Sequence, residues 1–220
     1  MGIPFLHGAK FFIEFFVLKI FKLMFVLRSI DRLYKTIPTY SISKQYRVKQ
    51  EPDNPDLIYG TLSNISFLYL LNLLHKKGCC KIYDLGCGDA RLLLSAALFF
   101  KSIQATGIEK VSDLVQAAKS ARLLSMAKIK KNQSTLTIME GDFLVENLEE
   151  AHIVYVNAAV FKEATWEQLR TKFSRLQPGS YVISVVRRIH DSQFILIYTG
   201  MHTASWGKTK VRIYHKINPL

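Results

Sequence analysis

The sequence is poor in cysteine, proline and glycine, and these shortages exclude several classes of protein. Three Cys in 220 residues, two of them adjacent (Cys79 and Cys80), cannot form a disulfide framework and lack zinc-binding spacing. Eleven Gly and six Pro exclude a collagen-like chain, and the absence of a repeat of about 20–50 residues excludes a solenoid. We therefore expect one globular domain in a reducing compartment, with no metal site.

Acidic residues are also scarce, since 17 Asp and Glu face 30 Lys and Arg and the net charge is +13. The excess is concentrated in residues 1–50, which hold nine Lys or Arg against Glu14 and Asp31. A nucleic-acid-binding protein more often clusters its basic residues on a folded module with interleaved aromatics. Here they are spread through an apolar segment, so we expect a membrane surface as a partner and no nucleic acid.

The apolar segment Phe11–Leu27 lacks the uninterrupted run that a membrane-spanning helix needs. Fourteen of its 17 residues are apolar, but Glu14, Lys19 and Lys22 interrupt it. An interfacial helix is favoured over a spanning one, because each central Lys costs about 2.5–3.5 kcal/mol on insertion. We expect residues 1–35 to contact a membrane; a buried core helix or an oligomer contact is the alternative. If the segment and its flanks form one helix, six polar residues lie on one broad face and Lys19 lies off it. The six are His7, Lys10, Glu14, Lys22, Arg28 and Arg32.

The chain is expected to divide into an N-terminal segment and the globular domain. After Arg28 the apolar pattern fades, and Pro38 and Pro52 mark a linker. Residues 1–50 are therefore predicted to form a hydrophobic, basic N-terminal helix and a linker, and residues 51–220 a separate domain.

Short strand patterns alternate with helical patterns in the second domain. The predicted helices are Ile65–His75, Ala90–Phe100, Asp113–Ile129 and Trp166–Arg175. The predicted strands are Lys81–Leu85, Gln104–Glu109, Thr135–Glu140, Ile153–Asn157, Tyr181–Val186, Phe194–Tyr198 and Val211–Ile217. No helix separates the last two. This order predicts an α/β fold with a doubly wound, mainly parallel seven-stranded sheet that ends in an antiparallel hairpin.

Ligands of such sheets bind beyond the carboxyl ends of the strands, and the first of these ends carries a glycine-rich turn. Gly86 and Gly88 let the backbone turn sharply and approach a ligand closely. The turn begins with Asp84, whose charge would repel a pyrophosphate but attract a cationic amino acid. The alternative is that Asp84 caps the following helix.

The ends of the next three strands also carry polar groups. Glu109, 25 residues after Asp84, can accept both hydroxyls of a ribose; otherwise it pairs with Lys110. Asp142 can accept the amine of adenine, and Phe143 either stacks on that base or belongs to the core. Asn157 places an amide in the crevice at the end of the fourth strand.

Together these motifs resemble class I S-adenosylmethionine-dependent methyltransferases over about residues 56–217. They are most similar to the disruptor-of-telomeric-silencing type, the non-SET histone lysine methyltransferases. The resemblance implies a Rossmann-like fold, S-adenosylmethionine as methyl donor, and a protein lysine as acceptor. The segments that carry it, besides the glycine-rich turn, are 58–63, 107–110, 140–144, 154–157, 205–208 and 161–180.

The family's roles pass to matching positions of this chain. They imply that Tyr59 and Gly60 cover the cofactor and its methyl group, and that Asn157 lies beside that group at the mouth of a lysine channel with Trp206 on its wall. They further imply that the amino-acid part of the cofactor is held by Asp84, Gly86 and Gly88. The ribose would be bound by Glu109, and the adenine by Asp142 and Phe143. Tyr59, Asn157 and Trp206 are therefore the expected catalytic residues.

Departures from the family pattern lie mostly in the substrate channel. The family's acid after Tyr-Gly is Thr61 here, and the second residue of its Asn-Asn pair is Ala158. The first member of its late tyrosine pair is Ile213. In the cofactor site the third loop glycine is Ala90, and Arg91, which we count with the cofactor-binding residues, replaces a Gln.

We therefore expect a membrane-associated protein-lysine N-methyltransferase that acts on a membrane or membrane-adjacent protein. Its catalytic domain would face the cytoplasm at a bacterial or host membrane, or lie in a mitochondrion. Two alternatives remain open: a methyltransferase for a small molecule or RNA, and a non-catalytic membrane adaptor that binds S-adenosylmethionine.

Overall fold

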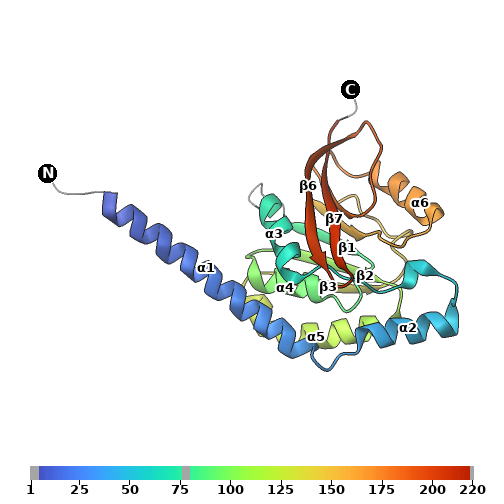
Figure 1. Ribbon diagram of the computed structural model, residues 1–220, viewed down its shortest axis with the longest axis horizontal. Helices are drawn as coiled ribbons and strands as arrows, with labels where there is room; N and C mark the ends of the chain where they lie inside the picture. The colour runs from blue at the N-terminus through green and yellow to red at the C-terminus, as the bar shows by residue number, and fades with distance from the viewer. Residues whose placement is uncertain (1–4, 76–79, 219–220) are drawn as a thin grey trace.

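The centre of the computed structural model is a seven-stranded sheet, with residues 5–75 and 80–218 described and side chains from residue 19 onward (Figure 1). The strand order is β3-β2-β1-β4-β5-β7-β6; β1 to β5 are parallel, and β7 is antiparallel to β5 and β6. The predicted doubly wound sheet with a terminal hairpin is confirmed. The strands are β1 (Lys81–Leu85), β2 (Gln104–Glu109), β3 (Thr135–Glu140), β4 (Ile153–Asn157), β5 (Tyr181–Val185), β6 (Phe194–Ala204) and β7 (Gly207–Lys216).

Helices cover both faces of this sheet. One hydrophobic cluster joins α1, α3, α4 and α5 to one face, and a second joins α6 to the other. Because both faces are covered, the central strands are rich in Val, Ile and Tyr, and all five residues of β5 are buried. The helices are α1 (Phe5–Tyr34), α2 (Thr39–Gln50), α3 (Asn64–His75), α4 (Arg91–Phe99), α5 (Ser112–Lys131) and α6 (Glu163–Phe173), with a 3₁₀ turn, η1, at Pro55–Leu57.

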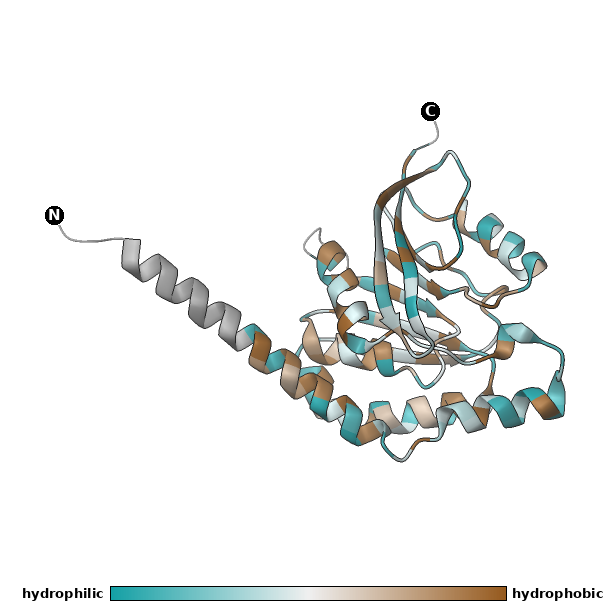
Figure 2. Cartoon of the chain, in the orientation of Figure 1, coloured by the Kyte–Doolittle hydropathy of each residue, from teal (hydrophilic) through white to brown (hydrophobic). Residues whose placement is uncertain are grey.

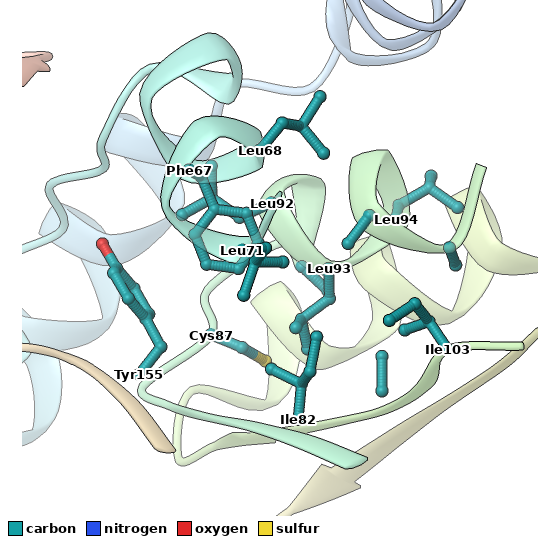
Figure 3. Packing of buried hydrophobic residues seen from close by; sticks show 14 of the residues in the cluster. Phe67, Leu68, Leu71, Ile82, Cys87, Leu92, Leu93, Leu94, Ile103 and Tyr155 are labelled. Atoms are coloured by element: carbon teal, nitrogen blue, oxygen red, sulfur yellow. The ribbon is translucent and has the colours of Figure 1, made fainter. Parts of the chain in front are cut away.

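The first cluster packs directly under the glycine-rich turn (Figure 3). The Phe67 ring meets Tyr155 edge-on, with ring centroids 5.0 Å apart. Cys87, the residue between the two glycines, points its Sγ into this core (Figure 3). A Cβ on Gly107 would lie 2.6 Å from that sulfur, so the neighbouring strand needs glycine there. The Cys87 thiol therefore packs in the first cluster and fixes the glycine-rich turn on it.

The segment expected as a linker forms a second helix instead. Thr39–Gln50 is α2, although its sequence carries few apolar residues. Tertiary contacts hold it, since Thr39 and Ser43 are buried against the domain. Hydrophobic periodicity misses such a helix, because polar side chains face the protein.

The described C-terminal part of α1 packs on the domain. Val26, Ile30 and Tyr34 are buried in the first cluster, as the alternative of a core helix expects. Of the predicted polar face, the side chains of His7, Lys10 and Glu14 lie outside the described residues, as does Cys79. Within residues 5–75 and 80–218, no helix is long and apolar enough to cross a membrane.

Candidate functional site

An open cavity lies at the carboxyl ends of the parallel strands, where the fold places ligand sites, and its empty space of about 810 Å³ includes solvent at the mouth. The ends of β1, β2, β3 and β4 and the loop before α3 form its walls. The structure brings seven of the predicted residues together here: Tyr59, Gly60, Gly86, Glu109, Asp142, Phe143 and Asn157.

The glycine-rich turn reaches the cavity at Gly86 and adopts a conformation that favours glycine. Gly86 and Gly88 have φ values of 78° and 57°, and the N–H of Gly86 donates to the Ile108 carbonyl at 2.9 Å. The Tyr59 ring lies directly over Gly88, so closely that a Cβ on Gly88 would collide with it. Tyr59 thus covers the turn at Gly88, and its expected contact with a cofactor stays a prediction.

Asp84 is a buried carboxylate, 2% exposed, behind the turn. It forms no ion pair among the residues that the structure describes. Burial, with the neighbouring Glu109 and Asp89 carboxylates, raises its pKa well above the usual value. It does not cap the next helix, since Ala90 is the N-cap of α4. Burial thus disfavours the charged form of Asp84, and a cationic group placed beside it would favour that form.

Glu109 ends β2 and is 7% exposed. Its Oε2 accepts the Gly88 N–H at 2.7 Å, and its Oε1 accepts the Val111 N–H at 2.9 Å. Burial raises its pKa, although these backbone donors act in the opposite direction. The alternative pairing with Lys110 is not found, because the Lys110 Nζ lies 2.6 Å from Glu51 Oε1. Glu109 therefore links the turn, the end of β2 and the cavity.

Asp142 and Phe143 form the wall beyond β3. Asp142 Oδ1 accepts the Leu144 N–H at 2.8 Å, which fixes the carboxylate at the cavity. The Phe143 ring stacks on Phe161, with centroids 5.7 Å apart and planes inclined by 22°. Phe143 is thus both a packing residue and an aromatic wall that an adenine could contact.

Asn157 lies at the end of β4 with one half of its amide fixed. Its Nδ2 donates to the Gly60 carbonyl at 2.8 Å, while its Oδ1 is buried and has no partner in the described part of the chain. A buried acceptor without a donor is costly, so this oxygen is suited to receive one from a ligand. Asn157 also fixes the Tyr59–Gly60 loop.

Trp206 reaches the site through the β6–β7 turn and remains 44% exposed. The segment after Gly60 pairs with the hairpin, because the Ser205 N–H donates to the Thr61 carbonyl at 2.8 Å. The indole packs against Gly60, where a Cβ would lie 2.6 Å from Cζ3. Trp206 therefore covers the outer side of the Gly60 loop and does not line the cavity itself.

Three predicted cofactor residues, Asp84, Gly88 and Arg91, do not line the cavity, and Arg91 is held by a different partner. Its guanidinium binds the fully buried Asp89, with NH2 2.5 Å from Oδ2, and lies over the Tyr34 ring. It is not among the cavity-lining residues. Arg91 lies outside the predicted cofactor site because Asp89, two residues before it, is a buried acid that binds its guanidinium.

Sequence reasoning missed several lining residues in α2, in the loop before α3 and in α6. Ser43, Asn54, Asp56 and Thr165 line the cavity, and Asp56 accepts the Lys162 N–H at 2.6 Å and the Thr165 hydroxyl at 2.5 Å. The Asn-Pro-Asp spacing is a turn signal that could have identified the loop. Within the described ranges, no group of three or more His, Cys, Asp or Glu could hold a metal ion.

Comparison with known proteins gives the family. The family model "Histone methylation protein DOT1" matches residues 41–210. A protein-lysine N-methyltransferase of Saccharolobus islandicus is 32% identical over 106 residues, which are 47% of this chain and 60% of that protein. An H3 lysine-79 specific histone-lysine N-methyltransferase of Drosophila melanogaster is 28% identical over 70% of this chain and 9% of its own length. The chain thus spans less than two thirds of either relative.

Solved structures share the fold at low sequence identity. An RNA methyltransferase from Salinibacter ruber in complex with S-adenosyl-L-homocysteine superposes with a TM-score of 0.52 and 23% identity, over 69% of this chain and 92% of that one. Magnesium protoporphyrin IX methyltransferase from Synechocystis with bound S-adenosylmethionine gives 0.56 and 14% identity, over 86% and 90%. These two enzymes share one fold but are named for different methyl acceptors. The methyl acceptor of this chain must therefore be argued from its own site, because the fold alone does not determine it.

Proposed function

The chain belongs to the DOT1 family of class I S-adenosylmethionine-dependent methyltransferases, and from this membership we propose that it methylates a lysine amine of a protein. Both the Saccharolobus islandicus and the Drosophila melanogaster relatives are named lysine methyltransferases. The observation that carries the proposal is the Asn157 amide, fixed by Gly60 and presenting an unpartnered buried oxygen at the cavity.

The residues of the cavity fit S-adenosylmethionine. The unpaired Asp84 carboxylate suits the α-ammonium group, and the open backbone of Gly86 and Gly88 lets the amino-acid part lie close. Glu109 suits the ribose hydroxyls, and Asp142 with Phe143 suits adenine. S-Adenosylmethionine, when bound, supplies a methyl group on a sulfonium that an uncharged amine takes up in line.

The chain must present that lysine uncharged and aligned. With an ordinary pKa of about 10.4, removing the lysine proton at pH 7 costs about 4.6 kcal/mol. Apolar surroundings lower this cost, because burial disfavours the ammonium form. Tyr59 and Gly60, the latter packed from outside by Trp206, provide such a wall, while Asn157 Oδ1 can accept an amine N–H and orient its lone pair. Alignment and exclusion of water are then the protein's main contributions.

Transfer of labelled methyl groups tests this function. The purified chain would be incubated with methyl-labelled S-adenosylmethionine and with fractions of its own cells, and acid hydrolysis would identify the methylated residue. We expect label on lysine, and at least a tenfold loss of turnover in Asn157→Ala with cofactor affinity largely retained. Asn147→Ala is the matched control, because its side chain accepts only the Glu149 N–H at 2.8 Å. Label that survives protease digestion would instead indicate an RNA or small-molecule acceptor, and binding without transfer an adaptor.

We also propose that residues 1–35 contact an anionic membrane, so that the acceptor is a membrane or membrane-adjacent protein. Four apolar side chains on α1 are exposed: Ile20, Phe21, Met24 and Phe25. Lys128 of α5 lies over the Phe25 ring with its Nζ 5.0 Å from the centroid, so a basic group flanks them. Hydrophobic and hydrophilic residues alternate along the described part of α1 (Figure 2). An apolar strip flanked by Lys suits the boundary between anionic head groups and acyl chains. On this proposal the catalytic domain faces the cytoplasm or the interior of a mitochondrion.

Co-flotation with vesicles tests the membrane contact. The full chain should float with phosphatidylserine-containing vesicles, and the double variant F21D/F25D should lose most of this binding. Val145→Asp is the control, since Val145 is 80% exposed in a loop after β3. Equal flotation of wild type and F21D/F25D would exclude this strip as the contact.

A further inference from the structure

Helix α2 holds the loop that covers the cavity through one buried hydroxyl. Ser43, 3% exposed, donates from its Oγ to the Leu57 carbonyl at 2.8 Å and accepts the Tyr59 N–H at 3.2 Å. Two backbone groups of the covering loop therefore depend on one side chain of α2. Tyr40 of the same helix meets the Tyr59 ring edge-on, with centroids 5.1 Å apart.

A second set of contacts joins the N-terminal helices to the glycine-rich turn. The Asp89 carboxylate is fully buried, and its Oδ2 accepts the Thr39 hydroxyl at 2.6 Å. Its Oδ1 lies 3.4 Å from the Tyr59 hydroxyl, and its backbone carbonyl accepts the Tyr34 hydroxyl at 2.8 Å. Arg91 neutralises this acid and also donates to Thr39 at 3.0 Å. Residues of α1, α2, the covering loop and the turn thus meet at Asp89.

These contacts determine where the Tyr59 ring lies. The ring touches Gly88 below, Tyr40 beside it and Asp89 at its hydroxyl, while Ser43 fixes its backbone nitrogen. Only the contact to Gly88 involves a glycine of the turn. The remaining contacts tie the cover to α2 directly or through Asp89.

We infer that Ser43 and Thr39 are positioning residues, through which the docked N-terminal helices hold Tyr59 over the glycine-rich turn and so determine affinity for S-adenosylmethionine. This inference rests on the proposed function only for the identity of the ligand. Neither residue belongs to the pattern of acids and glycines that the resemblance assigns to the cofactor.

The affinity of Ser43 variants for S-adenosylhomocysteine tests the inference by calorimetry on the full chain. Ser43→Ala should bind about tenfold more weakly, because two buried backbone groups of the cover lose their partner. Ser43→Thr keeps the hydroxyl and should restore most of the affinity.

Ser134→Ala is a closely matched control. The Ser134 hydroxyl accepts the Ile103 N–H and donates to the Phe100 carbonyl, both at 3.2 Å, in a buried position outside the cavity. It should lower the unfolding midpoint as Ser43→Ala does and leave the affinity unchanged. Equal affinity losses in Ser43→Ala and Ser134→Ala would overturn the positioning role.

A double-mutant cycle separates positioning from direct contact. In a Tyr59→Ala background, Ser43→Ala should weaken binding by less than twofold, because the ring that it positions is gone. Additive losses would show that Ser43 acts independently of Tyr59 and would refute the inference.

Hydrogen exchange on the wild type gives a readout that needs no variant to fold. Ligand should slow exchange within α2, residues 39–50, and at the Tyr59 amide. Binding without this protection would refute the inference, whereas no binding by the wild type would refute the proposed function instead.

Discussion

Replacement of Asp84 by Asn should change stability and ligand affinity in opposite directions. The carboxylate is 2% exposed, and within the described residues it has no ion pair and no hydrogen-bond donor to compensate its charge. A neutral amide removes the unfavourable burial of that charge and its repulsion by Glu109 and Asp89. We expect the ligand-free protein to gain about 1–2 kcal/mol of unfolding free energy.

The same change should remove much of the affinity for S-adenosylmethionine. A hydrogen bond to a charged partner contributes about 1.5–3 kcal/mol, which corresponds to roughly 10- to 150-fold in the dissociation constant. Calorimetry with S-adenosylhomocysteine measures the affinity, and urea unfolding without ligand measures the stability. Glu149→Gln, at an exposed site after β3, is the control and should change neither quantity.

The pH dependence of stability and of ligand affinity independently checks the direction of both predicted changes. The pKa of Asp84 is raised in the folded state, so the native protein holds this proton more tightly than the unfolded chain. Stability should therefore fall as pH rises from about 4, the ordinary Asp value, through the raised pKa, whereas ligand affinity should rise over that window. Asp84→Asn should flatten both profiles, leaving the contribution of Glu109, whose pKa burial also raises. A variant that is less stable without ligand, or that binds as tightly as the wild type, would refute the reasoning.

Three further substitutions test separate parts of the site. Asp142→Ala should weaken binding of S-adenosylhomocysteine at least tenfold in calorimetry, through loss of a charge-assisted acceptor for adenine; unchanged affinity would remove adenine from this wall. Gly88→Ala places a Cβ at φ 57° against the Tyr59 ring, so it should displace the cover and weaken binding about tenfold or more, with a normal circular dichroism spectrum. Arg91→Ala leaves the buried Asp89 charge without its cation and should cost about 3 kcal/mol in urea unfolding. Lys81→Ala, which removes an ion pair with the 76% exposed Glu150, should change the unfolding free energy far less, because water screens that pair, and equal losses in the two variants would contradict the burial argument.

The core strands were predictable because their patterns are local. β1, β2, β3 and β4 have the bounds that the sequence predicts, since each is a short strand pattern between turn or helix signals. The hairpin was predicted too short, because polar residues and Gly200 break the alternation in β6 on the solvent side. Helix α2 was missed because its stabilising contacts are long-range hydroxyl bonds that no periodicity reports.

The same distinction applies to the site. Residues that follow strands, such as Glu109 and Asn157, could be placed from topology alone, since parallel strands end at one edge. Arg91 was misplaced because its partner Asp89 is buried by Tyr34 and Thr39, which are 50 or more positions away in the sequence. Ser43 was not recognised for the same reason, since an isolated Ser carries no signal of the loop that it holds.

The three buried acids near the glycine-rich turn differ in what already satisfies them, and this difference orients the site. Asp89 is neutralised by Arg91 and receives the Thr39 hydroxyl. Glu109 receives two backbone N–H groups, so its charge is partly compensated while its edge faces the cavity. Asp84 alone has neither, so the negative potential at the end of β1 is available to a cation. A zwitterionic nucleoside ligand would therefore place its ammonium group beside β1 and its ribose beside β2. The Asp84 variant tests this orientation at the ammonium end of the ligand, and the Asp142 variant tests it at the adenine end.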